Sequence, residues 1–402
     1  MDTNTDQTVG KNVRRARRFA GLTLEQLAGQ IGKSKGWLSL VENGKARLEK
    51  RQDIARIAEV LAVSADTLLG EPAPEIAPGG HSYNLQPLRA VLLDASFDDP
   101  PDIPVRPVPV LGEVNWAMDQ ALRRADYDVM HRQLPGLLGE LQVQAATCSG
   151  PDRDEALRVM ILASATTTIM LRHFGRTDLA WVSADRGRQA AALLGDPAWT
   201  AAAAFECAQA RPSVNLSRSL LSTPRLADQF EPLIGDDVFA HEVYGMLRLS
   251  AALACAVQGD HQGAGEHGAE AARMAKPLGD RPDAFELFGE ANVGVWRTSL
   301  AVEAGNAEDA LAFADHVEPR ALASGNRRAA LKLERARAYS MLGRDTDAIG
   351  ELRQAERLSP AQVRNHPLIR DMVGYMLERA RREAGGRELR GLAWRMGLVR
   401  SA

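Results

Sequence analysis

Residues 34–42 gather side chains that suit the edges of nucleic-acid bases. Lys35 can donate hydrogen bonds to the acceptors of guanine, and Ser39 can bond to a base or to a phosphate. Trp37 and Leu40 offer apolar surface that suits the methyl group of thymine. The candidate base-contacting residues of this segment are Lys35, Gly36, Trp37, Ser39 and Leu40.

Hydroxyl, amide and ammonium groups flank the same segment. Such groups near helix ends can hold phosphates, because a helix N-terminus also presents free backbone N–H groups. The candidate phosphate-binding residues are Thr23, Ser34, Asn43 and Lys45. An alternative role for Trp37 is to pack beneath the following linker or against a neighbouring subunit, because an exposed indole is costly without a partner.

The spacing of small and apolar residues predicts how this segment is held. Ala28, Gly32 and Leu38 follow the pattern A-x3-G-x5-[ILV], and Val41 comes three residues later. Two helices that cross at a steep angle need a small residue at their contact, and glycine adopts a left-handed turn between them without steric cost. The pattern predicts a helix-turn-helix whose second helix points Leu38 and Val41 inward and leaves its other face free.

Around this unit the sequence resembles the lambda-repressor-like DNA-binding domain (the Cro/CI, xenobiotic-response-element family), over residues 9 to about 70. Thr23 would cap the second helix, and a fourth helix is expected over residues 53–61. The resemblance also implies a buried salt bridge between Arg17 and Glu42, which would hold the first helix and the recognition helix in register.

The positive charge of the chain is concentrated at one end. The whole chain has a formal net charge of −3, whereas residues 9–51 hold eleven Lys or Arg and three acids, a local balance of 11 − 3 = +8. A basic head on an acidic body favours phosphate binding at that end. The alternative is a solvated helix face, because arginine is plentiful throughout the chain.

The composition predicts a helical protein with more than one domain. At 402 residues the chain is too long for a single DNA-binding domain, and aromatics make up only 5%. The polar N-terminus lacks a signal-peptide pattern, and no run of about twenty apolar residues predicts a membrane span. Cys148, Cys207 and Cys255 are widely spaced, which predicts core residues in a reducing cytoplasm and neither a disulfide framework nor a metal site.

Three regions are expected along the chain. Residues 1–70 would form the DNA-binding domain, residues 71–110 a proline-rich linker with a short helix at 85–93, and residues 111–402 a helical-repeat domain. Five prolines between residues 100 and 109 predict a non-helical, extended segment.

The helices of the third region repeat. The clearest unit, residues 333–360, has the spacing of a tetratricopeptide repeat, in which small residues let two helices approach and a glycine permits the turn. Its matching positions are Ala336, Tyr339, Gly343, Ala348, Leu352, Ala355 and Pro360. Weaker copies place turn glycines at Gly305, Gly259 and Gly175, with one unrecognised helix pair that would start at residues 197–211. The expected fold is all-α, a helix-turn-helix domain followed by a tetratricopeptide-like α-solenoid, and a plain helical bundle is the alternative.

The combined architecture resembles bacterial regulators that join a Cro/CI-like domain to a C-terminal tetratricopeptide-like domain, among them the peptide-sensing quorum regulators of the RRNPP type. This resemblance implies a cytoplasmic transcription regulator that acts as a homodimer on double-stranded operator DNA. It also implies that the repeat domain senses a peptide or a small-molecule effector, and it implies no membrane partner.

A stacked array of helix pairs has a concave face lined by the first helix of each pair. Asparagine side chains there would suit a peptide backbone, because an amide donates and accepts at once, and arginines would suit a carboxylate or another anion. The candidate ligand-binding residues are Arg172, Arg211, Asn215, Tyr244, Arg248, Asn292, Trp296 and Arg337. The alternative for each is a bond between helices or a place on the solvated surface.

No pattern in the sequence predicts catalysis. His261 and His267 are six residues apart and so lie on different faces of a helix, which does not suit a metal. Asp315 and His316 are neighbours, and their side chains would diverge on a helix. We therefore expect no enzyme activity, cofactor or metal. A second hypothesis makes the repeat domain a docking platform for a protein partner, with no small ligand.

Overall fold

The computed structural model is helical throughout the residues that it describes. These residues are 9–63, 65–69, 83–210, 218–380 and 386–399. They contain no strand, so the all-α prediction is confirmed over these ranges. None of their helices is both long and apolar enough to cross a membrane.

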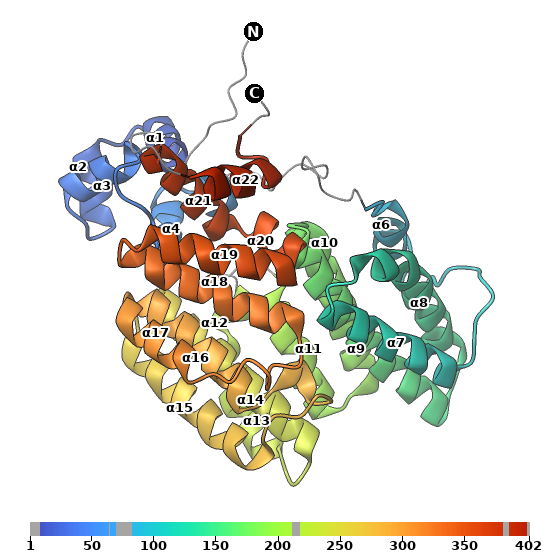
Figure 1. The fold of residues 1–402 in the computed structure, drawn as a ribbon. Helices are drawn as coiled ribbons and strands as arrows, with labels where there is room; N and C mark the ends of the chain where they lie inside the picture. The colour runs from blue at the N-terminus through green and yellow to red at the C-terminus, as the bar shows by residue number, and fades with distance from the viewer. Residues whose placement is uncertain (1–8, 64, 70–82, 211–217, 381–385, 400–402) are drawn as a thin grey trace.

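Two parts follow one another along the chain (Figure 1). The N-terminal unit, residues 9–69, packs on one end of the repeat body, which comprises α6–α22. The helices of the N-terminal unit are α1 (Val9–Phe19), α2 (Leu24–Gln30), α3 (Lys35–Glu42), α4 (Arg51–Val60) and α5 (Ala65–Leu69). The first half of the repeat body holds α6 (Gln86–Leu93), α7 (Val108–Arg123), α8 (Tyr127–Thr147), α9 (Gly150–His173), α10 (Thr177–Leu194), α11 (Pro197–Gln209), α12 (Arg218–Leu221) and α13 (Thr223–Phe230). The second half holds α14 (Val238–Gln258), α15 (His261–Leu278), α16 (Glu290–Ala304), α17 (Ala307–Asp315), α18 (Gly325–Met341), α19 (Asp345–Leu358), α20 (Pro360–Asn365), α21 (Pro367–Ala380) and α22 (Arg387–Arg395).

Side-chain caps fix the ends of α2 and α3. The Thr23 hydroxyl accepts the Gln26 backbone N–H, and the Gln26 side chain accepts the Thr23 N–H in return. Ser34 accepts the Trp37 backbone N–H at 3.1 Å and so starts α3. Gly32, in the turn between the two helices, has a φ of +69°. The predicted cap at Thr23 and the predicted left-handed turn are both confirmed.

The core of the N-terminal unit forms where its five helices, α1–α5, meet. Ala28, Leu38 and Val41 are all buried there, as their spacing predicts. Helices α1 and α3 approach closely at Gly10, because a Cβ at this position would lie 2.1 Å from the Val41 carbonyl oxygen. The predicted fourth helix exists, but α4 begins two residues before the predicted start at residue 53.

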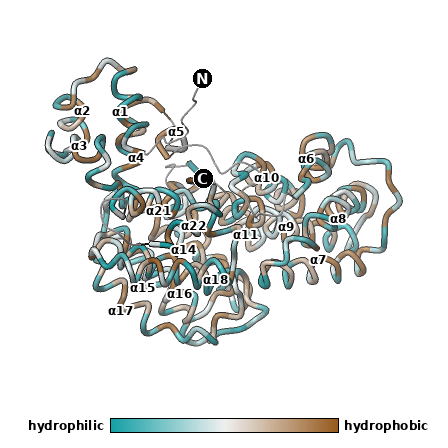
Figure 2. The backbone as a smooth tube through the Cα atoms, turned by 45° about the horizontal axis from the view of Figure 1, so that its top comes forward, coloured by the Kyte–Doolittle hydropathy of each residue, from teal (hydrophilic) through white to brown (hydrophobic). Residues whose placement is uncertain are grey.

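The repeat body is built from successive antiparallel helix pairs. Helix α9 packs on α10, α11 on α13, α14 on α15, α16 on α17, and α18 on α19. The turn glycines predicted from the sequence all have a left-handed φ, and they are Gly175, Gly259, Gly305 and Gly343. The pair that the sequence left unrecognised is formed by α11 and α13. Figure 2 places α7–α10 at one end of the body and α14–α18 toward the other.

The clearest sequence repeat matches one such pair. Ala336 on α18 and Ala348, Leu352 and Ala355 on α19 are fully buried in one cluster, so the small residues let the two helices approach. Helix α19 ends at Leu358, and Pro360 begins the next helix, where its missing N–H is not needed.

Part of the expected linker belongs to the body. Leu88 and Leu92 of α6 are fully buried in the same core as α8 and α9, and we therefore propose that the body begins at α6. Residues 71–82 of the expected linker lie outside the described residues. The expectation that the proline-rich segment is non-helical up to residue 110 is wrong at its end, because α7 starts at Val108 and accommodates Pro109 in its first turn.

One close contact inside the body gives a direct test of its packing. A Cβ at Gly245 on α14 would lie 2.0 Å from the ring of Phe288, which is fully buried. We expect Gly245→Ala to lower the stability of the chain by about 1–3 kcal/mol through overpacking, seen as a lower midpoint of thermal unfolding.

Gly265→Ala on the neighbouring α15 is the matched control. No atom lies within 4 Å of a Cβ at this exposed position. The control should leave the midpoint unchanged or raise it slightly, because alanine is a better helix former than glycine. Equal midpoints for Gly245→Ala and the wild-type chain would contradict the tight packing of α14 against Phe288.

Candidate nucleic-acid interface and effector cavity

Helix α3 lies on the outer side of the N-terminal unit, away from the repeat body (Figures 1 and 2). Its caps at Ser34 and its buried Leu38 and Val41 orient the helix, so its opposite face meets solvent. Among the predicted contact residues, the exposed ones are Thr23, Ser34, Lys35, Gly36, Leu40, Asn43 and Lys45, whereas Trp37 and Ser39 are half-buried. The structure therefore brings these residues together on one surface of the N-terminal unit.

Internal contacts modify the role of three of these residues. The Trp37 ring is half-buried against the core of its own unit, and the Lys33 ammonium lies 4.9 Å from the ring centroid. Asn43 donates to the Ser39 carbonyl at 2.7 Å and so closes the end of α3. Lys35 pairs with Glu25 at 3.3 Å, but both side chains are exposed, so the pair is weak and Lys35 stays accessible.

A buried ion pair holds α1 against α3. The Arg17 guanidinium donates to both carboxylate oxygens of Glu42, at 2.5 and 2.9 Å, and also to the Leu22 carbonyl at 2.7 Å. The side chains of Arg17 and Glu42 are 10% and 3% exposed. The Glu42 carboxylate raises the pKa of Arg17, and burial opposes it in part. The predicted pair is confirmed.

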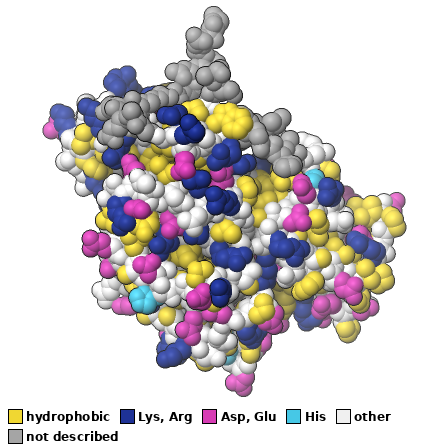
Figure 3. Space-filling model, in the orientation of Figure 1, with side chains coloured by type: hydrophobic (Ala, Val, Ile, Leu, Met, Phe, Trp, Pro, Cys, Tyr) yellow, Lys and Arg dark blue, Asp and Glu magenta, His cyan; other side chains and the backbone are white. Residues whose placement is uncertain are grey.

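The basic residues of the N-terminal unit lie on two different surfaces. Arg14, Arg15 and Arg18 on α1 are exposed, and Figure 3 shows Lys and Arg side chains gathered over this end of the molecule. By contrast, Lys50 and Arg51 bind the repeat body. Lys50 and Arg51 are therefore engaged by the repeat body, and phosphate binding stays a prediction for the exposed arginines of α1.

The N-terminal unit is fastened to the C-terminal ends of repeat helices. Lys50 donates from Nζ to the carbonyl of Ala304, the last residue of α16, at 3.0 Å. Gln52 donates to the carbonyl of Gln258, the last residue of α14, at 3.4 Å. Arg47 reaches Ser340 near the end of α18 at 2.7 Å. Helix C-termini carry unpaired carbonyls and partial negative charge, which cationic and amide donors satisfy.

A buried carboxylate lies at the centre of this contact. Glu303 is 1% exposed and accepts the Arg51 backbone N–H at 2.9 Å, while the Arg51 guanidinium lies 3.4 Å away. Arg337 donates to Glu303, to Glu334 and to the Glu49 carbonyl at 2.8, 2.8 and 3.0 Å. Burial alone would oppose ionisation of Glu303, but Arg51 and Arg337 hold its pKa below the usual value. We call Arg51, Glu303, Arg337 and Glu334 the interdomain network.

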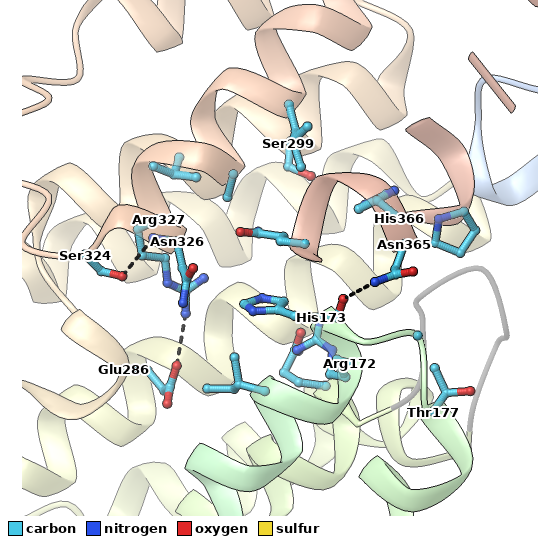
Figure 4. A pocket seen from close by; sticks show the side chains of 18 of the residues that line it. Arg172, His173, Thr177, Glu286, Ser299, Ser324, Asn326, Arg327, Asn365 and His366 are labelled. Atoms are coloured by element: carbon cyan, nitrogen blue, oxygen red, sulfur yellow. Dashed lines mark hydrogen bonds and ion pairs between the residues drawn. The ribbon is translucent and has the colours of Figure 1, made fainter. Parts of the chain in front are cut away.

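A cavity of about 540 Å³ opens beside this network. Its walls come from α7, α9, α10, α11, α14, α16, α18, α20 and α21, and from Arg51 and Leu69 of the N-terminal unit. In Figure 4, Arg172 and His173 lie between Arg327 with Glu286 on one side and Asn365 with His366 on the other. The size is typical of small-molecule sites. Because Arg51 and Glu334 line the cavity, it shares residues with the interdomain network.

Burial shapes the charge of the cavity wall. It lowers the pKa of Arg172 to about 10, so this group stays cationic at neutral pH. It raises the pKa of Glu206 well above the usual value, and the neighbouring Glu286 adds to this effect. Burial and nearby arginines lower the pKa of His173 and of His366 to about 3, so both rings are neutral.

The structure separates the predicted ligand-binding residues. Arg172 and Trp296 line the cavity. Arg337 instead belongs to the interdomain network, and Asn292 donates to the Glu286 carbonyl at 2.9 Å. Arg248 is held by Tyr244, and by Asp228 and Glu231 at 2.7 and 2.8 Å, away from the cavity. The predicted residues Arg211 and Asn215 lie outside the described residues.

Several cavity residues could not be predicted from the repeat pattern, because they come from helix ends and from the N-terminal unit. Arg327 lies in the first turn of α18, His366 follows α20, and Arg51 starts α4. A repeat frame predicts which face of a helix points inward, but it does not predict which segments close the ends of the array. One signal was present: Glu206 is the single carboxylate in the alanine-rich residues 198–210.

Comparison with known families decides the identity of the N-terminal unit. A family model described as a helix-turn-helix domain matches residues 9–69. The N-terminal unit is a helix-turn-helix domain. In the structure this domain is joined to a body of antiparallel helix pairs.

Comparisons over the whole chain add little to this result. No curated protein matches the chain. Among solved structures, Bacillus thuringiensis PlcR in complex with the peptide PapR7 and DNA aligns with 87% of this chain and 94% of that chain, at 12% identity and a TM-score of 0.39.

The Arg17–Glu42 pair of the helix-turn-helix domain can be tested by removing one charge. Glu42→Gln would leave the Arg17 guanidinium buried without an anion, which typically costs about 3–5 kcal/mol. We expect faster amide hydrogen exchange throughout α1 and α3, corresponding to a loss of that order. Glu25→Gln, which breaks only the exposed pair with Lys35, should change exchange by less than about 1 kcal/mol. Similar effects of both substitutions would refute the structural role of the buried pair.

Proposed function

We propose that this protein is a DNA-binding transcription regulator whose repeat body senses a small effector. The observation that carries the proposal is the orientation of the helix-turn-helix domain. Its α3 face is exposed, while the opposite side of the domain, at Lys50 and Arg51, is fastened to the rim of the cavity. DNA reading and effector binding thus use two sides of one small domain.

The proposed DNA contacts follow from the exposed surface of α3. Lys35 and Leu40 would reach base edges in the major groove, and Lys45 would hold a phosphate. Trp37 would contribute mainly by supporting α3, because its ring packs on the core of the domain. We propose that two copies of the chain bind one operator, because helix-turn-helix proteins commonly read half-sites one helical turn apart.

The proposed response to the effector is a change in the position of α3. An occupant of the cavity would contact Arg51 and Leu69, or disturb Glu334, and so change the interdomain network. The spacing of two recognition helices in a dimer would then change, which alters operator affinity. We propose no catalytic step, and we propose that the protein acts in the cytoplasm, where the operator DNA would be.

Two lysines of the helix-turn-helix domain should have separable effects on DNA binding. An operator can be selected from random duplexes with the full chain. Lys45→Ala should weaken binding to all sequences and reduce the slope of log affinity against log salt by about 1. Lys35→Ala should lower the preference at one base position, because a lysine that reaches guanine contributes to discrimination.

Lys276→Ala is the control for these variants, because Lys276 is exposed on α15, far along the repeat body. It should leave affinity, salt slope and preference unchanged. If Lys35→Ala and Lys45→Ala both leave specific affinity and salt slope intact, α3 is not the DNA-reading helix.

A further inference from the structure

The charges that line the cavity are not balanced. Six arginines and five carboxylates face it. Three of the pairs are local: Arg123 with Asp119 at 2.6 Å, Arg176 with Asp178 at 3.1 Å, and Arg327 with Glu286 at 3.0 Å. In each pair the two charges neutralise each other. The charged groups of the wall outside these pairs are Arg51, Arg172, Arg370, Glu206 and Glu334.

The remaining groups have different partners. Arg51 and Glu334 belong to the interdomain network. Arg370 donates to the carbonyls of Arg364 and Met396, at 3.1 and 2.5 Å. Arg172 has no hydrogen-bond acceptor and no ion-pair partner among the described residues. Arg172 is therefore the arginine of the described cavity wall whose guanidinium N–H groups have no protein acceptor.

The carboxyl group with the largest electrostatic effect on Arg172 does not fully neutralise its charge. Glu206 contributes the largest electrostatic effect on Arg172 among the acids, but its own pKa is raised well above the usual value by burial and by Glu286. The rise in the pKa of Glu206 favours its uncharged form, which leaves less negative charge beside Arg172. This is unfavourable in a largely enclosed space unless an anion enters.

Other polar atoms around the cavity also lack partners. The Trp296 indole N–H, one Glu206 carboxyl oxygen, the Gln362 side-chain oxygen and His366 Nδ1 are all buried and unpaired in the structure. Buried polar atoms are nearly always hydrogen-bonded in native proteins. These four residues line the same cavity as Arg172, so polar groups of both kinds, donors and acceptors, lack protein partners at its wall.

The same cavity has apolar walls that suit the rest of such an occupant. Leu122 on α7, Ile169 on α9 and Phe205 on α11 line it, together with Leu253 on α14 and Val295 on α16. Apolar surface with a few fixed polar groups is typical of small-ligand sites. Arg172 is the one arginine of the described cavity wall with neither an acceptor nor an ion pair, and a carboxylate presents two acceptor oxygens that fit a guanidinium.

We propose that the effector is a small carboxylic acid with an apolar body, whose carboxylate is bound by Arg172 and whose body lies against Phe205 and the neighbouring aliphatic residues. This inference rests on the proposed function, because it gives the chemistry of the effector for the same cavity. A free small acid and the C-terminal carboxylate of a short peptide share this chemistry.

Two related fluorescent probes can test the role of charge. 8-Anilinonaphthalene-1-sulfonate carries an anionic group on an apolar body, and N-phenyl-1-naphthylamine is its uncharged counterpart. With the full chain, we expect Arg172→Gln to weaken binding of the anionic probe by about tenfold or more, because a charge-assisted contact is lost. The uncharged probe should change by less than about twofold, because its apolar contacts remain.

Arg158→Gln is the matched control, because Arg158 lies on the same helix but pairs with Glu155 on the surface. It should leave the affinity of both probes unchanged. If Arg172→Gln weakens both probes equally, the residue has a structural role and the proposal fails. If the anionic probe does not bind, or binds Arg172→Gln as well as the wild-type chain, the proposal also fails.

Competition with the anionic probe identifies the source of the carboxylate. If the effector is a free small acid, decanoate should displace the probe and decanamide should not. If it is a peptide, a leucine-rich pentapeptide with a free C-terminus should displace the probe, and the same peptide with an amidated C-terminus should not. If neither carboxylate displaces the probe, or if the amides compete equally well, the proposal is overturned. DNA binding by α3 is measured separately, so a failure here with intact operator binding would leave the proposed regulator function standing.

Discussion

The arrangement of the two parts depends on the docking of basic and amide side chains onto the C-terminal ends of α14, α16 and α18. Lys50 and Gln52 satisfy carbonyls at the ends of α16 and α14, Arg47 binds the Ser340 hydroxyl of α18, and Arg51 and Arg337 keep the buried Glu303 ionised. A buried carboxylate is tolerated only with such partners, and removal of one partner typically costs about 3–5 kcal/mol. The contact therefore fixes one geometry, because a small shift of the domain against the body would leave a buried charge without its ion-pair partner.

This docking explains why one small domain can face both DNA and an effector cavity. The turn glycines of the repeats contribute directly, because a Cβ at Gly259 would lie 2.2 Å from Gln52 and one at Gly305 would lie 2.6 Å from Lys50. The glycines that permit the tight turns also let α4 approach the helix ends. Because α3 lies on the other side of the domain, the proposed response at the cavity would reach α3 through the buried core of the helix-turn-helix domain.

Much of the fold could be predicted from the sequence, because it depends on local rules. The spacing of Ala28, Gly32 and Leu38 indicates two crossed helices, and the left-handed glycines mark the turns of the repeats. The Arg17–Glu42 pair was predicted from the family resemblance. These features repeat a pattern of residue types at fixed spacing, and no long-range information is needed to find them.

The cavity and the docking contact could not be predicted in the same way. Arg51 and Glu303 are 252 residues apart, and nothing in the local pattern of either predicts the other. Arg337 was expected to bind a ligand because it lies on the inner face of a repeat, yet its partners come from α16 and from the helix-turn-helix domain. The repeat pattern predicts that Arg337 lies on an inner face, but it does not predict that the helix-turn-helix domain covers that face. This contact depends on the whole assembled fold.

The most direct test of the docking contact is the exchange rate of the Arg51 backbone amide. The first N–H groups of an α-helix have no partner within the helix and normally exchange quickly. In this protein the Arg51 N–H donates to Glu303, so it should be protected in the wild-type chain and exchange rapidly in Glu303→Ala, which has no side-chain acceptor, while amides in the middle of α4 stay protected. Glu290→Ala, at the exposed start of α16, should leave Arg51 protected. An Arg51 amide that exchanges at the same rate in the wild-type chain and in Glu303→Ala would contradict the account.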